Sequence, residues 1–333
     1  MNMKRWIALV VAAALFFISM GFQFMSSILS ANMNEAFNFA DLDQEFSEKV
    51  VEEGSPASKI AVLHLNGVIQ NTTPSSLLNT SSYNHQRFLD MLEHAGEDNS
   101  VKGIVLHVNT PGGGVVESAE IHDKINEIKE ETNKPIYVSM GNTAASGGYY
   151  VSAPADKIVA HKATLTGSIG VIMENINFTQ LAEELGIDFN TIKSGEHKDI
   201  LSSYREMTEE ERQILQSMID DMYNDFVDVI VEGRGLSEER VRELGDGRIY
   251  TGSQELEVEL VDAIGSLDDT IAMIKEEHDL ASSRVVEYEN GMPFGQFFGA
   301  QIQNMFGNNT DFTGIKELLQ QGNAPRAMYL YSR

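Results

Sequence analysis

Residues 101–114 read VKGIVLHVNTPGGG, an apolar run that ends in a proline and three glycines. The run predicts a buried β-strand over residues 101–108, because strands covered on both faces are apolar throughout. A helical pattern follows directly, and its apolar stripe comprises Val116, Ala119, Ile121, Ile125 and Ile128. A strand, a glycine turn and an amphipathic helix in this order are typical of a βαβ unit.

The same alternation continues along the chain. Further strands are predicted at residues 60–65, 135–140, 157–161, 168–172 and 187–193, and further helices at 85–94, 178–185, 208–232, 236–244 and 253–258. Thr208 is the predicted cap of the longest helix, and the three glutamates that follow it favour the positive end of the helix dipole. We therefore expect an α/β fold with a largely parallel sheet.

The composition limits the possible partners. The chain has 333 residues, of which 50 are acidic and 24 basic, and its net charge is −26. Such a surface repels phosphate backbones, so we expect no nucleic-acid partner. The absence of cysteine excludes disulfides, thiolate catalysis and cysteine-ligated zinc. No HExxH motif occurs either, and we expect neither a metal nor another cofactor.

The N-terminal 30 residues predict a membrane anchor. Lys4 and Arg5 precede an apolar run over residues 6–22, and no further charge follows until Glu35. About 20 apolar residues cross a bilayer, and basic residues before the span predict a cytoplasmic N-terminus. A cleaved signal peptide is the alternative, since it shares the basic start and the apolar middle. We expect an uncleaved, single-pass anchor in the cell membrane, with the remaining chain outside the cytoplasm.

Three further regions follow the anchor. Residues 31–58 are acidic and predict a solvated stalk, and residues 59–280 carry the strand–helix alternation of one domain. Residues 281–333 form a predicted C-terminal extension. Its last ten residues, APRAMYLYSR (324–333), could lie in a peptide groove, become a cleavage product, or form a frayed tail.

Two glycine-rich turns are candidates for chemistry. The glycines at 112–114 precede a helix, where backbone N–H groups stabilise developing negative charge; a plain tight turn explains them equally well. Residues 140–150 read MGNTAASGGYY and place Ser146 among small residues after a strand. This pattern is similar to a nucleophile elbow, and a helix-capping serine is the alternative.

A serine nucleophile needs a base. None of the eight histidines lies in a recognisable triad pattern. Residues 193–199 read KSGEHKD and offer Lys193 and Lys198. A lysine can act as a base only after it loses its proton, which burial in an apolar cleft favours, and two solvated lysines are the alternative.

Several motifs in this order resemble the SppA-type signal peptide peptidases. They are MGNTAASGGYY (140–150), LTGSIGVI (165–172), KSGEHKD (193–199), REMT (205–208), GRIYTGSQ (247–254) and LVD (260–262). The resemblance covers residues 58–280, and the predicted anchor fits it. Two positions depart from the pattern: Glu259 stands where glycine is expected, and Glu255 stands where a small residue is common.

The resemblance implies a crotonase/Clp-protease-like ββα superhelix and a Ser/Lys dyad. It assigns Ser146 as the nucleophile, Lys198 as the general base and Ser168 as the hydroxyl that orients the lysine amine. It also implies that the backbone N–H groups of Gly113 and Gly147 form the oxyanion hole. Its expected substrates are peptides, namely remnant signal peptides at the membrane, and its expected assembly is a ring-like homo-oligomer whose protomers share sites.

Two other functions stay open at this point. A crotonase-like acyl-CoA enzyme would use the same fold and a backbone oxyanion hole, but it needs neither a serine–lysine pair nor an exported domain. A membrane-anchored scaffold without catalysis would show no peptidase activity and would tolerate the loss of Ser146.

Overall fold

The computed structural model describes residues 16, 17, 19, 46–71, 83–290 and 327–331. The larger of two compact units comprises Glu48–Glu289 and Gly295–Arg333, and it contains all the candidate site residues. Nearly all of the predicted anchor, residues 1–30, lies outside the described residues. Within the described ranges, none of the helices is both long and apolar enough to span a bilayer.

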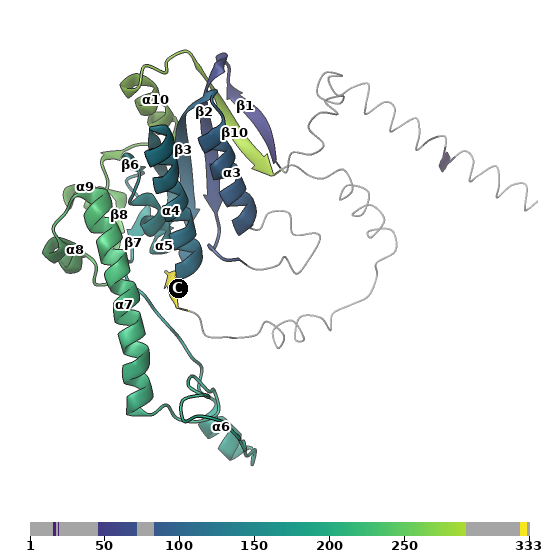
Figure 1. Cartoon of the computed structure of the whole chain (residues 1–333), viewed down its shortest axis with the longest axis vertical. Helices are drawn as coiled ribbons and strands as arrows, with labels where there is room; N and C mark the ends of the chain where they lie inside the picture. Colours follow the sequence, from purple (N-terminus) through teal and green to yellow (C-terminus); the bar gives the residue numbers. More distant parts are fainter. Residues whose placement is uncertain (1–15, 18, 20–45, 72–82, 291–326, 332–333) are drawn as a thin grey trace, which may run out of the picture. The chain divides into compact units, whose positions relative to one another are not determined.

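A mostly parallel sheet organises the described part of the chain, where it has nine strands (Figure 1). Its main path runs β1 (Phe46–Glu52), β10 (Ser283–Asn290), β2 (Ser55–Asn66), β3 (Val101–Thr110), β5 (Ile136–Ala145), β6 (Lys157–Ala160) and β9 (Ala263–Ile264). β7 (Leu165–Gly167) pairs in parallel with the end of β5, and β8 (Ile249–Thr251) pairs antiparallel with β7. The predicted parallel sheet is therefore confirmed.

Helices cover this sheet and build its core. α3 (His85–Glu97) and α4 (Val115–Thr132) lie side by side in front of the strands in Figure 1. α10 (Leu267–Glu277) packs Ile271 and Ile274 against apolar side chains of β2, β3 and β10. The short α5 (Gly147–Ser152) is buried over its whole length, directly after β5. The core thus reaches the residue that follows β5, which is Ser146.

The long helix α7 (Glu209–Arg234) begins as predicted. The Thr208 hydroxyl accepts the Glu211 N–H at 3.2 Å, and the Glu211 carboxylate accepts the Thr208 N–H at 3.0 Å. Only the C-terminal half of its predicted apolar face is covered, because Phe226 is fully buried while Met218 is 42% exposed. α8 (Glu238–Leu244) and α9 (Gly252–Glu257) confirm the two shorter helices.

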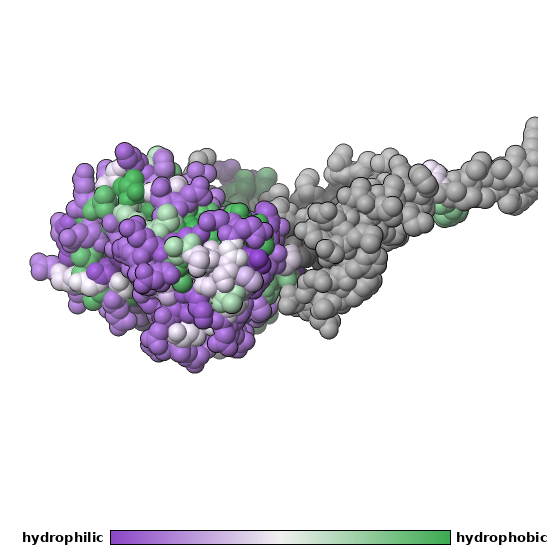
Figure 2. All heavy atoms as spheres, turned by 90° about the horizontal axis from the view of Figure 1, so that it is seen from above, coloured by the Kyte–Doolittle hydropathy of each residue, from purple (hydrophilic) through white to green (hydrophobic). Residues whose placement is uncertain are grey.

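Residues 173–222, here called the arm, include the exposed half of α7 and the short helix α6 (Thr179–Glu184), which confirms the helix predicted there. Figure 1 shows the arm extending away from the sheet. In the face drawn in Figure 2, hydrophilic residues predominate and apolar residues form small groups between them, as the acidic composition leads one to expect.

Three local predictions are wrong. Residues 168–172 form no strand, because β7 ends at Gly167 and only an isolated bridge at Ile172 follows. Residues 187–193 form no strand, since their apolar side chains are exposed on the arm and not stacked on the sheet. Val116 is 65% exposed and does not belong to the buried stripe of α4.

The sheet also extends beyond the range predicted for the domain. β1 and the start of β2 lie within residues 31–58, where a stalk was expected, and β10 lies within the expected extension at 281–333. β10 pairs in parallel with β2, so both segments contribute edge strands to the same sheet. Residues 291–326 lie outside the described part.

Candidate active site

Ser146 lies at the turn between β5 and α5. Its φ of 55° and ψ of −115° are rare for a residue with a side chain, and such strain persists only where the surroundings enforce it. The Ser146 N–H donates to the Gly167 carbonyl at 2.7 Å, and the Ser146 carbonyl accepts from Tyr149 and Tyr150 at 2.9 Å. This sharp, fixed strand-to-helix turn has the geometry of a nucleophile elbow.

The hydroxyl of this serine makes no internal bond. Ser146 is 1% exposed, and its Oγ has no hydrogen-bond partner among the described residues. A buried hydroxyl usually has a partner, so the unpaired Oγ makes Ser146 the candidate nucleophile. Within this single chain, no described histidine or lysine takes that place.

Two backbone nitrogens converge beside Ser146. A Cβ built on Gly147 would lie 3.1 Å from the Gly113 nitrogen, and one built on Gly112 would lie 2.7 Å from the Gly147 nitrogen. β4 (Gly112–Gly114) is held from its other side by Ile69, whose N–H donates to Gly112 at 2.9 Å and whose carbonyl accepts from Gly114 at 2.8 Å. Side chains would fill this space, so glycines are required here.

Ser168 belongs to the same turn system. It follows Gly167, which pairs with Ala145 and accepts the Ser146 N–H. Ser168 has a φ of 50°, and its N–H donates to the Arg248 carbonyl at 2.8 Å. The structure therefore brings Ser146, Gly113, Gly147 and Ser168 together at one end of the sheet.

Lys198 is on the arm, away from this group. Its side chain is exposed, and only its backbone N–H is bonded, to the Gly195 carbonyl at 3.2 Å. The neighbouring Lys193 instead donates to Glu196 and Asp199, each at 2.7 Å. Of the predicted site residues, Lys198 is the one that this chain does not bring to Ser146.

A charged network fixes the loop that carries Lys198. Arg205 donates to the Asp199 carboxylate at 2.7 and 2.9 Å and to Glu211 at 2.8 Å. Arg205 and then Lys193 hold the pKa of Asp199 well below its ordinary value. The loop thus has a defined shape although it lies far from the sheet.

A strand near the C-terminus pairs with β4, which is here called the glycine edge. The sequence alone suggests that this segment could lie in a peptide groove, but it does not say where that groove is. β11 (Met328–Leu330) pairs antiparallel with β4, with Tyr329 opposite Gly113. On its other side, Met328 exchanges backbone hydrogen bonds of 3.0 and 3.1 Å with Ile172. A Cβ on Gly112 would collide with the Tyr329 carbonyl oxygen, so this oxygen lies beside the Gly147 nitrogen.

The Tyr329 side chain fills an aromatic pocket that the sequence reasoning missed. It is fully buried, stacks on Tyr150 with ring centroids 5.0 Å apart, and lies 4.7 Å from the Phe226 ring. Its hydroxyl donates to the Met222 carbonyl at 2.9 Å. Tyr150 is the last residue of the serine motif, and Phe226 belongs to the predicted apolar face of the long helix. Neither position therefore predicts a separate aromatic pocket.

The described histidines bond elsewhere in the fold. The Nδ1 atoms of His64 and His107 are 3.0 Å apart. Burial lowers the pKa of His107, and the neighbouring His64 lowers it further. His85 lies between the Tyr83 hydroxyl and the Glu120 carboxylate, at 2.6 Å from each. These contacts use histidines as structural links.

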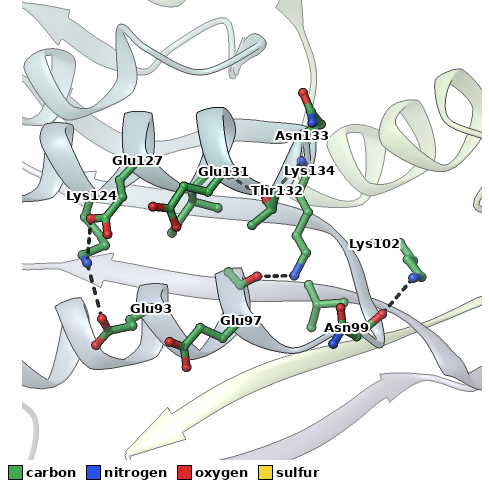
Figure 3. A pocket seen from close by; sticks show the side chains of 13 residues that line it. Glu93, Glu97, Asn99, Lys102, Lys124, Glu127, Glu131, Thr132, Asn133 and Lys134 are labelled. Atoms are coloured by element: carbon green, nitrogen blue, oxygen red, sulfur yellow. Dashed lines mark hydrogen bonds and ion pairs between the residues drawn. The ribbon is translucent and has the colours of Figure 1, made fainter.

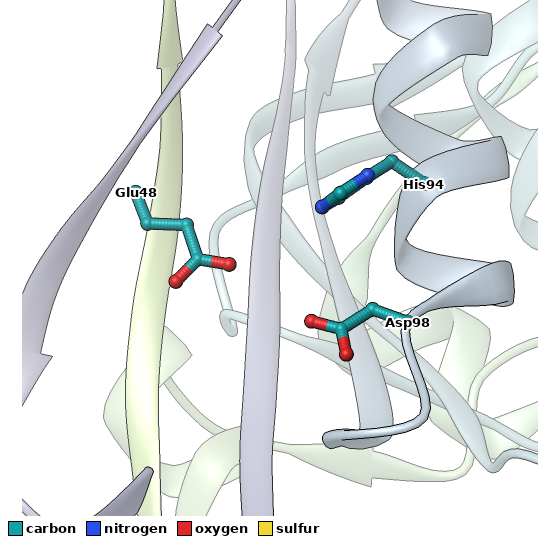
Figure 4. A group of neighbouring side chains, drawn as sticks. All are labelled: Glu48, His94 and Asp98. Carbon is teal, nitrogen blue, oxygen red and sulfur yellow. The ribbon is translucent and has the colours of Figure 1, made fainter. Parts of the chain in front are cut away.

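Two polar clusters lie apart from the serine. Figure 4 shows Glu48, His94 and Asp98 facing one another, but the Lys59 amine is 2.8 Å from Glu48 and 3.4 Å from Asp98 and already neutralises the carboxylates. Figure 3 shows a groove between α3 and α4 whose lining includes four glutamates and three lysines. Its volume is about 660 Å³. There Lys134 donates to carbonyls at the end of α3, which is a capping role.

Comparison with known proteins finds that the chain is similar to peptidases. Residues 128–281 match Peptidase family S49. The chain is 40% identical to a putative signal peptide peptidase SppA of Enterococcus faecium, over 99% of both chains. It is 41% identical to a putative protease of Methanocaldococcus jannaschii over 62% of this chain and 67% of that protein, and 31% identical to Protease 4 of Haemophilus influenzae over 66% and 35%.

The chain is a serine protease, as the strained serine and these relatives together indicate. It belongs to peptidase family S49.

Proposed function

We propose that the chain is a membrane-anchored endopeptidase that uses a Ser146/Lys198 dyad to cleave remnant signal peptides. One observation carries the proposal: a segment of the chain itself, Met328–Leu330, lies as an antiparallel strand on the glycine edge beside Ser146. An extended peptide added to an exposed strand edge is a recurrent mode of peptide recognition. The Tyr329–Leu330 peptide bond therefore serves as a guide to how a substrate lies.

The aromatic pocket indicates the preferred substrate. The residue whose carbonyl lies beside Gly147 places its side chain against Tyr150 and Phe226. A large apolar or aromatic residue before the cleaved bond fits this pocket, because burial of such a side chain is favourable. Signal peptides are rich in such residues, and an anchor over residues 1–30 would keep the protease near them.

A neighbouring protomer supplies the base in this proposal. The orphaned Ser146 hydroxyl and the exposed Lys198 are incomplete halves of one site. The arm that carries Lys198 also exposes large apolar side chains, which are Ile176, Phe178, Leu181, Leu185, Ile187, Phe189 and Ile192. Such a surface is typical of an interface, so a ring-like homo-oligomer would cover it and remove water from Lys198.

The proposed reaction uses this arrangement. Neutral Lys198 takes the Ser146 proton while Oγ attacks the peptide carbonyl, and the N–H groups of Gly113 and Gly147 stabilise the resulting oxyanion. The Lys198 ammonium protonates the leaving amine, and a water activated by the same amine hydrolyses the acyl-enzyme. The Ser168 hydroxyl orients the lysine amine.

The fold and topology complete the proposal. We place the parallel sheet in the crotonase/Clp-protease-like ββα superhelix class, with the N-terminus cytoplasmic and the protease domain outside the cytoplasm. An acyl-CoA enzyme is the weaker alternative, because the glycine edge is paired with a peptide strand. A non-catalytic scaffold does not account for the strain at Ser146.

The test uses the full chain purified in detergent. Ser146→Ala and Lys198→Ala should each lower kcat/KM on an apolar peptide by about 1,000-fold or more, because the dyad acts as a unit. Lys193→Ala is the matched control, and it should cost far less because Lys193 is bonded to Asp199. Near-wild-type turnover by Lys198→Ala would refute the dyad.

A further inference from the structure

Glu255 is a buried carboxyl group behind the candidate active site. It lies on α9, is 0% exposed, and neither of its oxygens has a hydrogen-bond partner of ordinary geometry among the described residues. Acidic side chains are almost never fully buried without a partner. The capping box of Thr251 and Gln254 fixes the start of this helix and thereby the inward direction of Glu255.

Burial decides the protonation of this group. It raises the pKa of Glu255 to about 8, against smaller opposing effects from Thr166, Arg234 and the Gly167 N–H. The Arg234 guanidinium, which also pairs with Asp262 at 2.7 Å, opposes this rise but less strongly than burial promotes it. The other titratable groups within electrostatic reach are Tyr149 and Tyr250, both of which have raised pKa values and stay neutral. Glu255 therefore carries a proton at neutral pH.

The groups beside Glu255 are those that hold the catalytic turn. The Thr166 hydroxyl donates to the Ala144 carbonyl at 2.7 Å, and the Gly167 carbonyl accepts the Ser146 N–H at 2.7 Å. Gly167 has a φ of 73°, and Ser146 and Ser168 are also in the left-handed region. Such backbone strain is kept only while the supporting hydrogen bonds are intact.

A charge on Glu255 would compete for these bonds. A buried carboxylate accepts strongly from any nearby donor, and the donors here are the Thr166 hydroxyl and the Gly167 N–H. If the Thr166 hydroxyl turned from Ala144 to Glu255, the pairing of β5 with β7 would loosen one residue before the Ala145–Ser146 turn. The protonated carboxyl group does not compete for these donors in this way.

We propose that Glu255 is a positioning residue, which keeps the Thr166–Ser168 turn and with it Ser146 in the catalytic arrangement only while it carries a proton. Ionisation of Glu255 at alkaline pH then lowers the activity of the protease. The proposal rests on the proposed function of Ser146 and adds a limit on turnover at high pH.

The test compares Glu255→Gln with wild type over about pH 6 to about pH 10, using the full chain in detergent. Glutamine mimics the protonated acid and cannot ionise. Wild-type kcat should fall at least about fivefold from its maximum on the alkaline side, with an apparent midpoint at about 8, the pKa to which burial raises Glu255. Glu255→Gln should lack this fall. Glu257→Gln, an exposed glutamate on the same helix, is the matched control and should keep the wild-type profile.

A second measurement does not depend on catalysis. Because the folded-state pKa is raised, Glu255 lowers stability progressively as pH rises from its ordinary pKa towards about 8. The unfolding midpoint of wild type should therefore fall relative to Glu255→Gln over that range, while Glu257→Gln should follow wild type.

The outcomes separate the two proposals. An alkaline fall that persists unchanged in Glu255→Gln overturns the positioning role, even if the stability difference is present. Absence of peptidase activity, and of fluorophosphonate labelling at Ser146, in every variant would refute the proposed function instead, and the pH dependence of unfolding would still report the ionisation of Glu255.

Discussion

The two halves of the candidate site differ in how completely one chain builds them. Ser146 lies in the core directly after β5, where its N–H bonds to Gly167 of β7 and where β4 lies beside Gly147. Lys198 lies on the arm, where a salt-bridge network shapes the loop but large apolar side chains remain exposed. In the proposed mechanism, folding of one chain therefore preorganises the nucleophile and the oxyanion donors, whereas assembly of the oligomer delivers the base.

A substitution beside Ser146 should greatly reduce peptidase activity and leave assembly of the oligomer intact. In Gly113→Ala the new Cβ would collide with the Ile69 carbonyl, so β4 must shift and the Gly113 N–H must leave its place. We expect kcat/KM to fall about 100-fold or more, as with the loss of an oxyanion donor. Gly170→Ala is the control, because its Cβ would meet its nearest atom at 3.7 Å, an ordinary contact. Equal activities of the two variants would contradict the assignment.

A substitution on the arm should weaken assembly of the oligomer and leave the fold around the sheet intact. Ile192 is fully exposed, and Ile192→Asp would place a charge in the surface that we expect a neighbour to cover. The variant should shift to smaller species by light scattering and lose about tenfold or more in activity. Val51→Asp, an exposed valine on β1, introduces the same charge outside the arm. If Ile192→Asp kept both its mass and its turnover, the arm would not be an interface.

The C-terminal residues that include β11 allow a third test, at the glycine edge beside Ser146. If β11 lies on β4 as a substrate does, active oligomer should cleave the Tyr329–Leu330 bond in a fraction of chains. Intact mass spectrometry should then find wild-type chains that lack residues 330–333 and Ser146→Ala chains that retain them. Identical masses would restrict the tail to a bound, uncleaved strand.

The sequence predicts the elements whose pattern reflects contacts close in the chain. The parallel strands β2, β3 and β5 are apolar because both faces are covered, and α7 begins at Thr208 because its capping box is local. Residues 187–193 were predicted as a strand because their apolar residues alternate, yet those residues lie exposed on the arm. The pattern records that a side chain is apolar, not which surface will cover it.

The site divides in the same way. The small residues around Ser146 and the glycines of β4 are visible locally because strained turns require them. The pairing of β11 with β4 joins segments more than 200 residues apart, and no local pattern specifies such a pairing. Glu255 stood out only as a departure from a motif, and its burial behind Gly167 gave that departure a physical meaning.

The most direct test of the shared site is complementation between two inactive variants. Ser146→Ala and Lys198→Ala chains are co-expressed, and the mixed oligomers are purified in detergent. If one protomer supplies the serine and its neighbour the lysine, random mixing in equal amounts should restore about a quarter of wild-type activity, because that share of sites keeps both groups. If each chain completed its own site, the mixture would stay as inactive as either variant alone, and that result would contradict the account.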